Sequence, residues 1–117
     1  MTLQECYQEL GGDFADVKRR LVNDRLIYRY LGKFEKDENY LRLIKAMEAG
    51  DRDASFLAAH TLKGLCQNLG LGKLLRPVER ITELLRSGQT AEAAVWLGEL
   101  SESYEATLRC IGICIGS

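Results

Sequence analysis

The chain has 117 residues, of which 16 are lysine or arginine and 17 are aspartate or glutamate, and its formal net charge at pH 7 is −1. This length fits one domain with its own core, residues 1–117, and leaves no room for a kinase domain as well. The near-zero charge excludes a strongly basic surface for nucleic acid, and no apolar run is long enough to span a bilayer. We therefore expect soluble protein partners, with no nucleic acid and no membrane among them.

Residues 1–22 are expected to form two short helices. The first covers 2–10 and stops at Gly11-Gly12, and the second runs over about 13–21. The first residues of the chain lack the charged and apolar regions of a signal peptide, so we expect a cytoplasmic protein with reduced thiols.

Residues 24–49 are expected to form the first long helix. Asn23-Asp24 offers an N-cap, and Gly50 ends the segment. The stretch 36–39 is either a break in this helix or only a kink. Apolar residues recur at helical spacing on both sides of it: Leu26, Ile27, Tyr30, Leu31 and Phe34 before it, and Tyr40, Leu41, Ile44 and Met47 after it.

Two further helices follow directly. Asp51 or Asp53 caps the first, which Gly70-Leu71-Gly72 terminates. The second begins near Lys73, and Pro77 is tolerable only in its first turn, where amide groups have no intrahelical partner. The inward positions of this second helix are Leu74, Val78, Ile81 and Leu85.

The last helix begins after a turn at Ser87-Gly88, where Thr90 is the expected cap, and runs to about Arg109. Short connections make neighbouring long helices antiparallel. With no convincing strand alternation, the sequence predicts an all-α fold: an antiparallel up-and-down four-helix bundle over 24–110, with the short helices of 1–22 covering one end. The inward positions of the last helix are Ala94, Leu97, Leu100, Tyr104 and Leu108.

The helix around His60, the only histidine, has two dissimilar faces. His60 points away from the apolar side and is reachable by a large partner. Gly64 lies one turn later and leaves bare backbone beside the imidazole, at a cost of about 1 kcal/mol relative to alanine. Lys63 brings a mobile positive charge suited to a phosphoryl group on a ring nitrogen. Together these residues indicate a phosphoryl acceptor. The apolar side carries Ser55, Ala58, Leu62, Leu65, Cys66 and Leu69, and the other side carries Asp53, Phe56, Leu57, His60, Lys63, Gly64 and Gln67.

The segment His60-Thr61-Leu62-Lys63-Gly64 continues with Asn68-Leu69-Gly70-Leu71, then Leu74 and Glu79. Over residues 51–88 this pattern resembles the histidine phosphotransfer (HPt) domains of multistep two-component phosphorelays. The resemblance implies a phosphorelay intermediate. His60 would accept a phosphoryl group from a receiver-domain aspartate or from a histidine kinase or hybrid kinase, and pass it to another response-regulator receiver. It also implies no catalytic site, metal or cofactor of its own, because the receiver supplies Mg²⁺.

Three more polar residues are expected to support His60. Counted from the Gly-Leu-Gly exit, the register of the next helix brings Thr82 and Arg86 toward the level of the imidazole, and Gln67 shares its face. The resemblance implies that a polar residue at the position of Thr82, commonly glutamine or glutamate, hydrogen-bonds the second ring nitrogen. Threonine departs from this pattern and is short. Thr82 as an ordinary surface residue and Arg86 as a solvated helix-end cation are the alternatives.

Phe56 and Leu57 are apolar on the otherwise solvated face beside His60. We interpret them as a docking patch for the partner, although they could instead cover the edge of a neighbouring helix. An alternative from a different functional class is a non-transferring adaptor that binds a receiver or kinase domain without carrying phosphate. An enzyme is disfavoured, because one histidine without a Gly-rich phosphate loop or paired carboxylates provides no catalytic apparatus.

Four cysteines are present, but their spacing predicts neither a metal site nor a disulfide framework. Cys6 and Cys66 are isolated in the sequence, and Cys66 belongs to the apolar side of its helix as a core residue. Cys110 and Cys114 share one helical face and are expected to be packing residues or residues of a fraying helix end rather than a pair of metal ligands. The apolar segment 111–117 either packs back onto the bundle or mediates self-association.

Overall fold

A computed structural model describes residues 1–116, and this part of the chain is helical without a strand. The all-α prediction is therefore confirmed. The helices are α1 (Leu3–Leu10), α2 (Phe14–Leu21), α3 (Asp24–Glu35), α4 (Asn39–Glu48), α5 (Arg52–Leu69), α6 (Gly72–Arg86), α7 (Thr90–Val95) and α8 (Leu97–Cys114).

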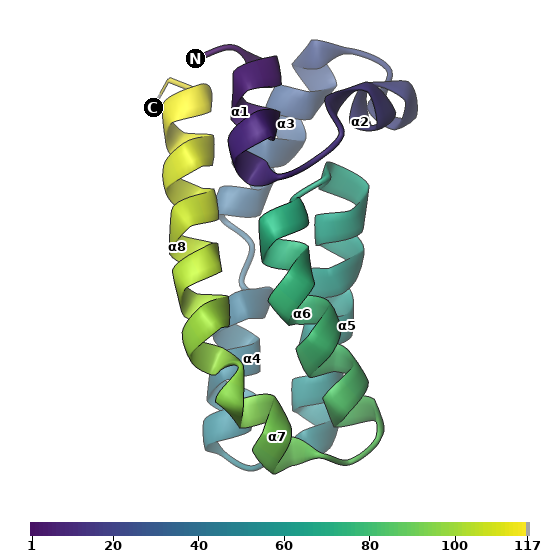
Figure 1. Cartoon of the computed structure of the whole chain (residues 1–117), viewed down its shortest axis with the longest axis vertical. Coiled ribbons are helices and arrows are strands. Elements are labelled where there is room, and N and C mark those ends of the chain that lie inside the picture. The colour runs from purple at the N-terminus through teal and green to yellow at the C-terminus, as the bar shows by residue number, and fades with distance from the viewer. Residues whose placement is uncertain (117) are drawn as a thin grey trace.

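The long helices form a bundle with the two short N-terminal helices at one end (Figure 1). Helix α4 continues the path of α3, α5 returns beside α4, α6 packs against α5, and α8 closes the bundle against α6 and α3. Tyr40 at the start of α4 stacks on Tyr104 of α8, with ring centroids 3.9 Å apart, and Phe34 of α3 meets the same ring edge-on. These aromatic contacts hold α8 at the junction of α3 and α4.

The stretch 36–39 is a true break, since α3 ends at Glu35 and α4 begins at Asn39. The Asp37 carboxylate, just before α4, accepts a hydrogen bond from the backbone N–H of Asn39 at 2.8 Å and a second from the Asn39 side-chain amide at 3.0 Å. The break therefore divides the predicted long helix into two helices with separate termini.

The last predicted helix is in fact two helices, α7 and α8, which are separated at Trp96. The predicted carboxyl end of this helix, near Arg109, was also wrong. Thr90 is the first residue of α7 rather than its cap, and Ala93, not Ala94, is buried. Helix α8 continues past Arg109 to Cys114 because Cys110, Ile111 and Cys114 are buried, and α8 packs on α1. The bundle therefore extends beyond residue 110. In the segment 111–117, Ile111 is buried and Ile113 exposed, while Ser117 lies outside the described residues.

Pro77 also lies elsewhere than predicted. Helix α6 begins at Gly72, so Pro77 is in the second turn and not the first. Without an N–H, it leaves the Lys73 carbonyl without its normal intrahelical partner. The proline ring is buried in the core, which offsets this loss.

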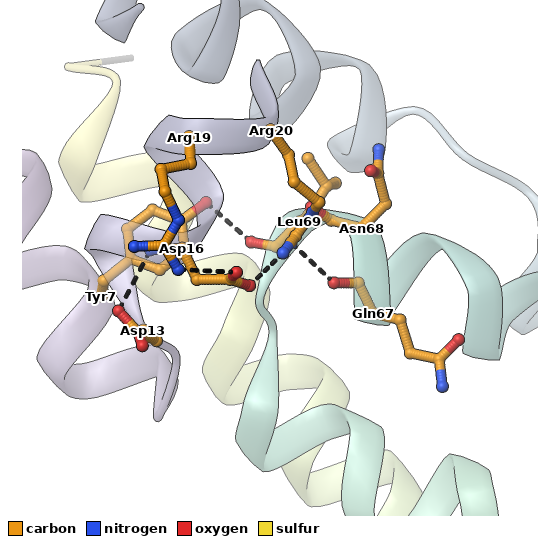
Figure 2. Close-up of polar contacts among 8 residues, drawn as sticks. All are labelled: Tyr7, Asp13, Asp16, Arg19, Arg20, Gln67, Asn68 and Leu69. Atoms are coloured by element: carbon orange, nitrogen blue, oxygen red, sulfur yellow. Dashed lines mark hydrogen bonds and ion pairs between the residues drawn. The ribbon is translucent and has the colours of Figure 1, made fainter. Parts of the chain in front are cut away.

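The N-terminal helices hold the carboxyl end of α5 (Figure 2). The Arg20 guanidinium donates to the carbonyl oxygens of Gln67 at 3.0 Å and Asn68 at 2.7 Å, and it is oriented by Asp16. The Tyr7 hydroxyl donates to the Leu69 carbonyl at 2.7 Å. These three carbonyls are in the last turn of α5, where no backbone N–H of the helix is available to bind them. The side chains from α1 and α2 therefore supply the missing hydrogen-bond donors.

The same contact brings backbone against backbone. A Cβ on Gly12 would overlap the Gly70 carbonyl, and one on Gly72 would overlap the Gly11 carbonyl. Gly70 also ends α5 in the left-handed conformation, with φ of 68°. Only glycine allows this approach of the α1–α2 loop to the α5–α6 turn.

Cys6 is not isolated in space, although it is in the sequence. Its sulfur lies 3.5 Å from that of Cys110, across α1 and α8, and both thiols are buried and free. Burial raises the pKa of Cys6 and of Cys110, so both are neutral thiols that pack as small core residues. Cys66 is fully buried in the core, as its helical face predicted.

Candidate functional site

Helix α5 presents His60 to solvent on the face predicted from its periodicity. Asp51 caps the helix by accepting from the Ala54 amide at 3.0 Å, and Gly70 ends it. Ala58, Leu62 and other residues of the opposite face are buried in the core, while His60 is exposed. Within residues 1–116, the ring nitrogens make no hydrogen bond. The imidazole is therefore open to an incoming group.

An aromatic ring stands beside the imidazole, and a cation stands beside that ring. The Phe56 ring, one turn earlier, stacks on it with centroids 5.7 Å apart and an angle of 15° between the planes. The Arg86 guanidinium of α6 lies 5.4 Å from the centroid of Phe56. Phe56 therefore links His60 to Arg86, and it is half-buried rather than freely exposed.

A carboxylate lies between the two cations of this face. Glu83 Oε1 is 4.0 Å from Lys63 Nζ and 3.7 Å from an Arg86 terminal nitrogen. Arg52 of α5 donates to the carbonyl oxygens of Leu85 at 3.0 Å and Arg86 at 2.9 Å, at the end of α6. Arg52 thus fixes the end of α6 that carries the Arg86 side chain.

Gly64 and Gln67 lie further along the same exposed face. A Cβ built on Gly64 would meet no described atom within 4 Å apart from its chain neighbours and the backbone of its own helix, so the packing of the bundle does not require glycine there. The side chain of Gln67 is exposed, and the backbone carbonyl of the same residue accepts the hydrogen bond from Arg20. These two positions leave an unobstructed surface beyond the imidazole.

Leu57 faces the other side of His60, toward α4. It is 66 % exposed and lines an open groove of about 630 Å³ between α4 and α5. The predicted docking pair is therefore divided, with Phe56 toward α6 and Leu57 toward α4. The groove is lined by Asn39, Arg42, Lys45, Ala54, Leu57, Ala58 and Thr61, which give it an apolar floor and basic edges.

The expectation for Thr82 was wrong. Its side chain is fully buried, and its hydroxyl donates to the Val78 carbonyl of its own helix at 2.7 Å. Its position next to Ile81 and one turn after Val78, both buried, turns it inward. Neither the surface alternative nor a contact with the imidazole holds.

Glu83 and Arg52 were missed in the sequence. A signal for Glu83 was present, since it lies three residues before Arg86 and so shares a face of the same helix with that residue. Arg52 carried no such signal, because it acts through carbonyl groups of the neighbouring helix.

This arrangement defines a class: a helical bundle that offers one solvent-exposed histidine, flanked by cations, on the middle of a long helix. A family model described as "Hpt domain" matches residues 33–109, well over half of the chain, and the chain belongs to that family. Comparison with curated proteins and with solved structures finds no match.

Membership of this family gives the chain a phosphotransfer role in two-component signalling, as a phosphocarrier that interacts with kinases and receivers. Helices α1 and α2, which hold the end of α5, lie before the matched residues. No helix within residues 1–116 is long and apolar enough to cross a membrane. In the same part of the chain, no group of three or more histidine, cysteine, aspartate or glutamate side chains could hold a metal ion.

Proposed function

We propose that His60 is the phosphoryl acceptor of a phosphorelay, loaded by a receiver-domain aspartate or a histidine kinase and discharged to another receiver. The observation that supports this most is the exposed imidazole of α5, with Lys63 on the same face and open space over Gly64. We further propose that residues 1–117 act as one cytoplasmic module without a catalytic site of its own.

In the proposed transfer, an imidazole nitrogen attacks the phosphorus of an aspartyl phosphate on the receiver. The phosphorus–nitrogen bond forms as the bond to the aspartate oxygen breaks, and the aspartate leaves as a carboxylate. The Mg²⁺ that assists this step belongs to the receiver. Lys63 and Arg86 would balance the negative charge of the phosphoryl oxygens on this side. Both phosphorylated species are reactive, so the step runs in either direction.

Docking of the partner would use the surfaces on both sides of His60. Leu57 and the α4–α5 groove offer an apolar contact with basic edges to the receiver. Phe56 would hold the orientation of the imidazole during docking, because its ring already stacks on that of His60. Gly64 would let the receiver approach the backbone of α5 closely.

The test is transfer of radiolabelled phosphate from a panel of phosphorylated receivers to this protein and to its His60→Gln variant. Label that is stable in alkali and labile in acid, on the parent protein alone, is the expected result. Binding of receivers without label would instead favour the non-transferring adaptor. His60 is exposed and makes no hydrogen bond within the described residues, so the variant should fold normally.

A further inference from the structure

The carboxylate of Glu83 is the acidic partner of both cations beside His60. It lies 4.0 Å from Lys63 Nζ and 3.7 Å from Arg86, distances longer than a charge-assisted hydrogen bond of about 2.8 Å. The side chains of Glu83 and Arg86 are about half exposed, and that of Lys63 is 21 % exposed. Contacts of this length and exposure are weak and exchange readily.

A phosphoryl group on His60 would compete with Glu83 for these cations. It carries a charge of about −1.5 to −2 and three acceptor oxygens, against one negative charge on a carboxylate. Lys63 lies one turn after His60 on α5, and Arg86 packs against Phe56, whose ring stacks on the imidazole. Both side chains are long and flexible, so each can reorient toward a phosphoryl group on the imidazole.

We propose that Glu83 is a positioning residue that holds Lys63 and Arg86 while His60 is free and releases them to the phosphoryl group when His60 is loaded. This inference rests on the proposed function of His60. After the exchange, the Glu83 carboxylate is left unpaired close to a second negative charge. It therefore raises the free energy of the loaded state and favours discharge to the next receiver.

Glu79 provides a matched control. It lies one turn before Glu83 on the exposed face of α6, and it makes no ion pair within residues 1–116. Both residues become neutral amides of the same size in Glu83→Gln and Glu79→Gln. Only the first substitution removes a partner of the two cations.

The experiment measures the equilibrium between one phosphorylated receiver and His60, using the full chain and its Glu83→Gln and Glu79→Gln variants. Glu83→Gln should shift the equilibrium toward phosphorylated His60 by about threefold, the size expected for weak, half-exposed ion pairs, and Glu79→Gln should leave it unchanged. Adding Lys63→Met to Glu83→Gln should remove most of the shift. A merely structural Glu83 would change the melting temperature and not this equilibrium.

Loading with phosphoramidate, a small phosphoryl donor, followed by phosphorus NMR separates this inference from the proposed function. If phosphohistidine forms in the parent but Glu83→Gln leaves the equilibrium with the receiver unchanged, the role of Glu83 is overturned and that of His60 stands. If neither phosphoramidate nor any receiver loads His60, the proposed function is overturned and this inference with it.

Discussion

Replacing Gly64 by alanine should make the protein more stable and a poorer phosphoryl carrier. Gly64 lies inside α5, where glycine is less favourable than alanine by about 1 kcal/mol. Apart from the chain neighbours and the backbone of the same helix, no described atom lies within 4 Å of the added Cβ, so the full gain should be realised. For 117 residues the unfolding entropy is about 0.25 kcal/mol/K, which makes the expected rise in melting temperature about 4 °C.

The same methyl group should obstruct a docked receiver. An extra methyl in a close-packed contact costs about 1–3 kcal/mol, so transfer to His60 should slow about 5-fold to 150-fold. Calorimetry gives the stability, and rapid-quench transfer from a phosphorylated receiver gives the rate.

Gly32 is the control for this experiment, because it lies inside α3 and a Cβ there also meets no described atom within 4 Å. Gly32→Ala should raise the melting temperature similarly and leave transfer unchanged. Equal transfer rates in Gly64→Ala and the parent protein would refute the idea that this glycine serves the approach of a partner.

Three other substitutions test the fold and the docking surface. Arg20→Ala should lower the free energy of unfolding, measured in urea, by about 1–2 kcal/mol, because two α5 carbonyls lose their hydrogen-bond donor. The control Arg19→Ala removes only an exposed ion pair and should cost under about 0.5 kcal/mol. Equal losses in the two variants would contradict the capping role of Arg20. Burial raises the pKa of the Cys66 thiol from 9.0 to about 12, so the unfolded chain loses that proton first and stability falls as pH rises above about 9. Cys66→Ala should make this fall shallower by about 1.4 kcal/mol per pH unit in urea titrations, and an unchanged slope would exclude the thiol as its source. Leu57→Ala should weaken receiver binding several-fold by calorimetry, while the similarly exposed Ile113→Ala should not; equal effects would argue against the α4–α5 groove.

The faces of α5 could be predicted because they depend on local chemistry. The aspartate cap, the glycine exit and the apolar spacing are all contained within about twenty residues, and they fixed the exposure of His60. The break at 36–39 remained open in the sequence, because an acidic and amide-rich stretch suits both a kink and a new cap.

The errors arose where tertiary contacts override local signals. Helix α8 continues past Arg109 because α1 covers its end, and the contact of Cys6 with Cys110 joins residues 104 positions apart. The error for Thr82 had a different cause: the prediction used its distance along the helix and ignored the direction in which its side chain points around the helix axis. Its spacing of four from Val78 already placed it on the apolar side.

The contact between the α1–α2 loop and the α5–α6 turn bears on how this chain can change during evolution. The backbones of Gly12 and Gly70 are in direct contact, and Arg20 and Tyr7 donate hydrogen bonds to backbone carbonyls of α5. Substitutions in α5 cannot remove these acceptors, because every residue has a backbone carbonyl. A different N-terminal segment could replace residues 1–22 only if it brought its own glycine and its own donors to the same three carbonyls. The N-terminal helices and the turn after the histidine helix should therefore be inherited together, although family membership is already recognisable in residues 33–109.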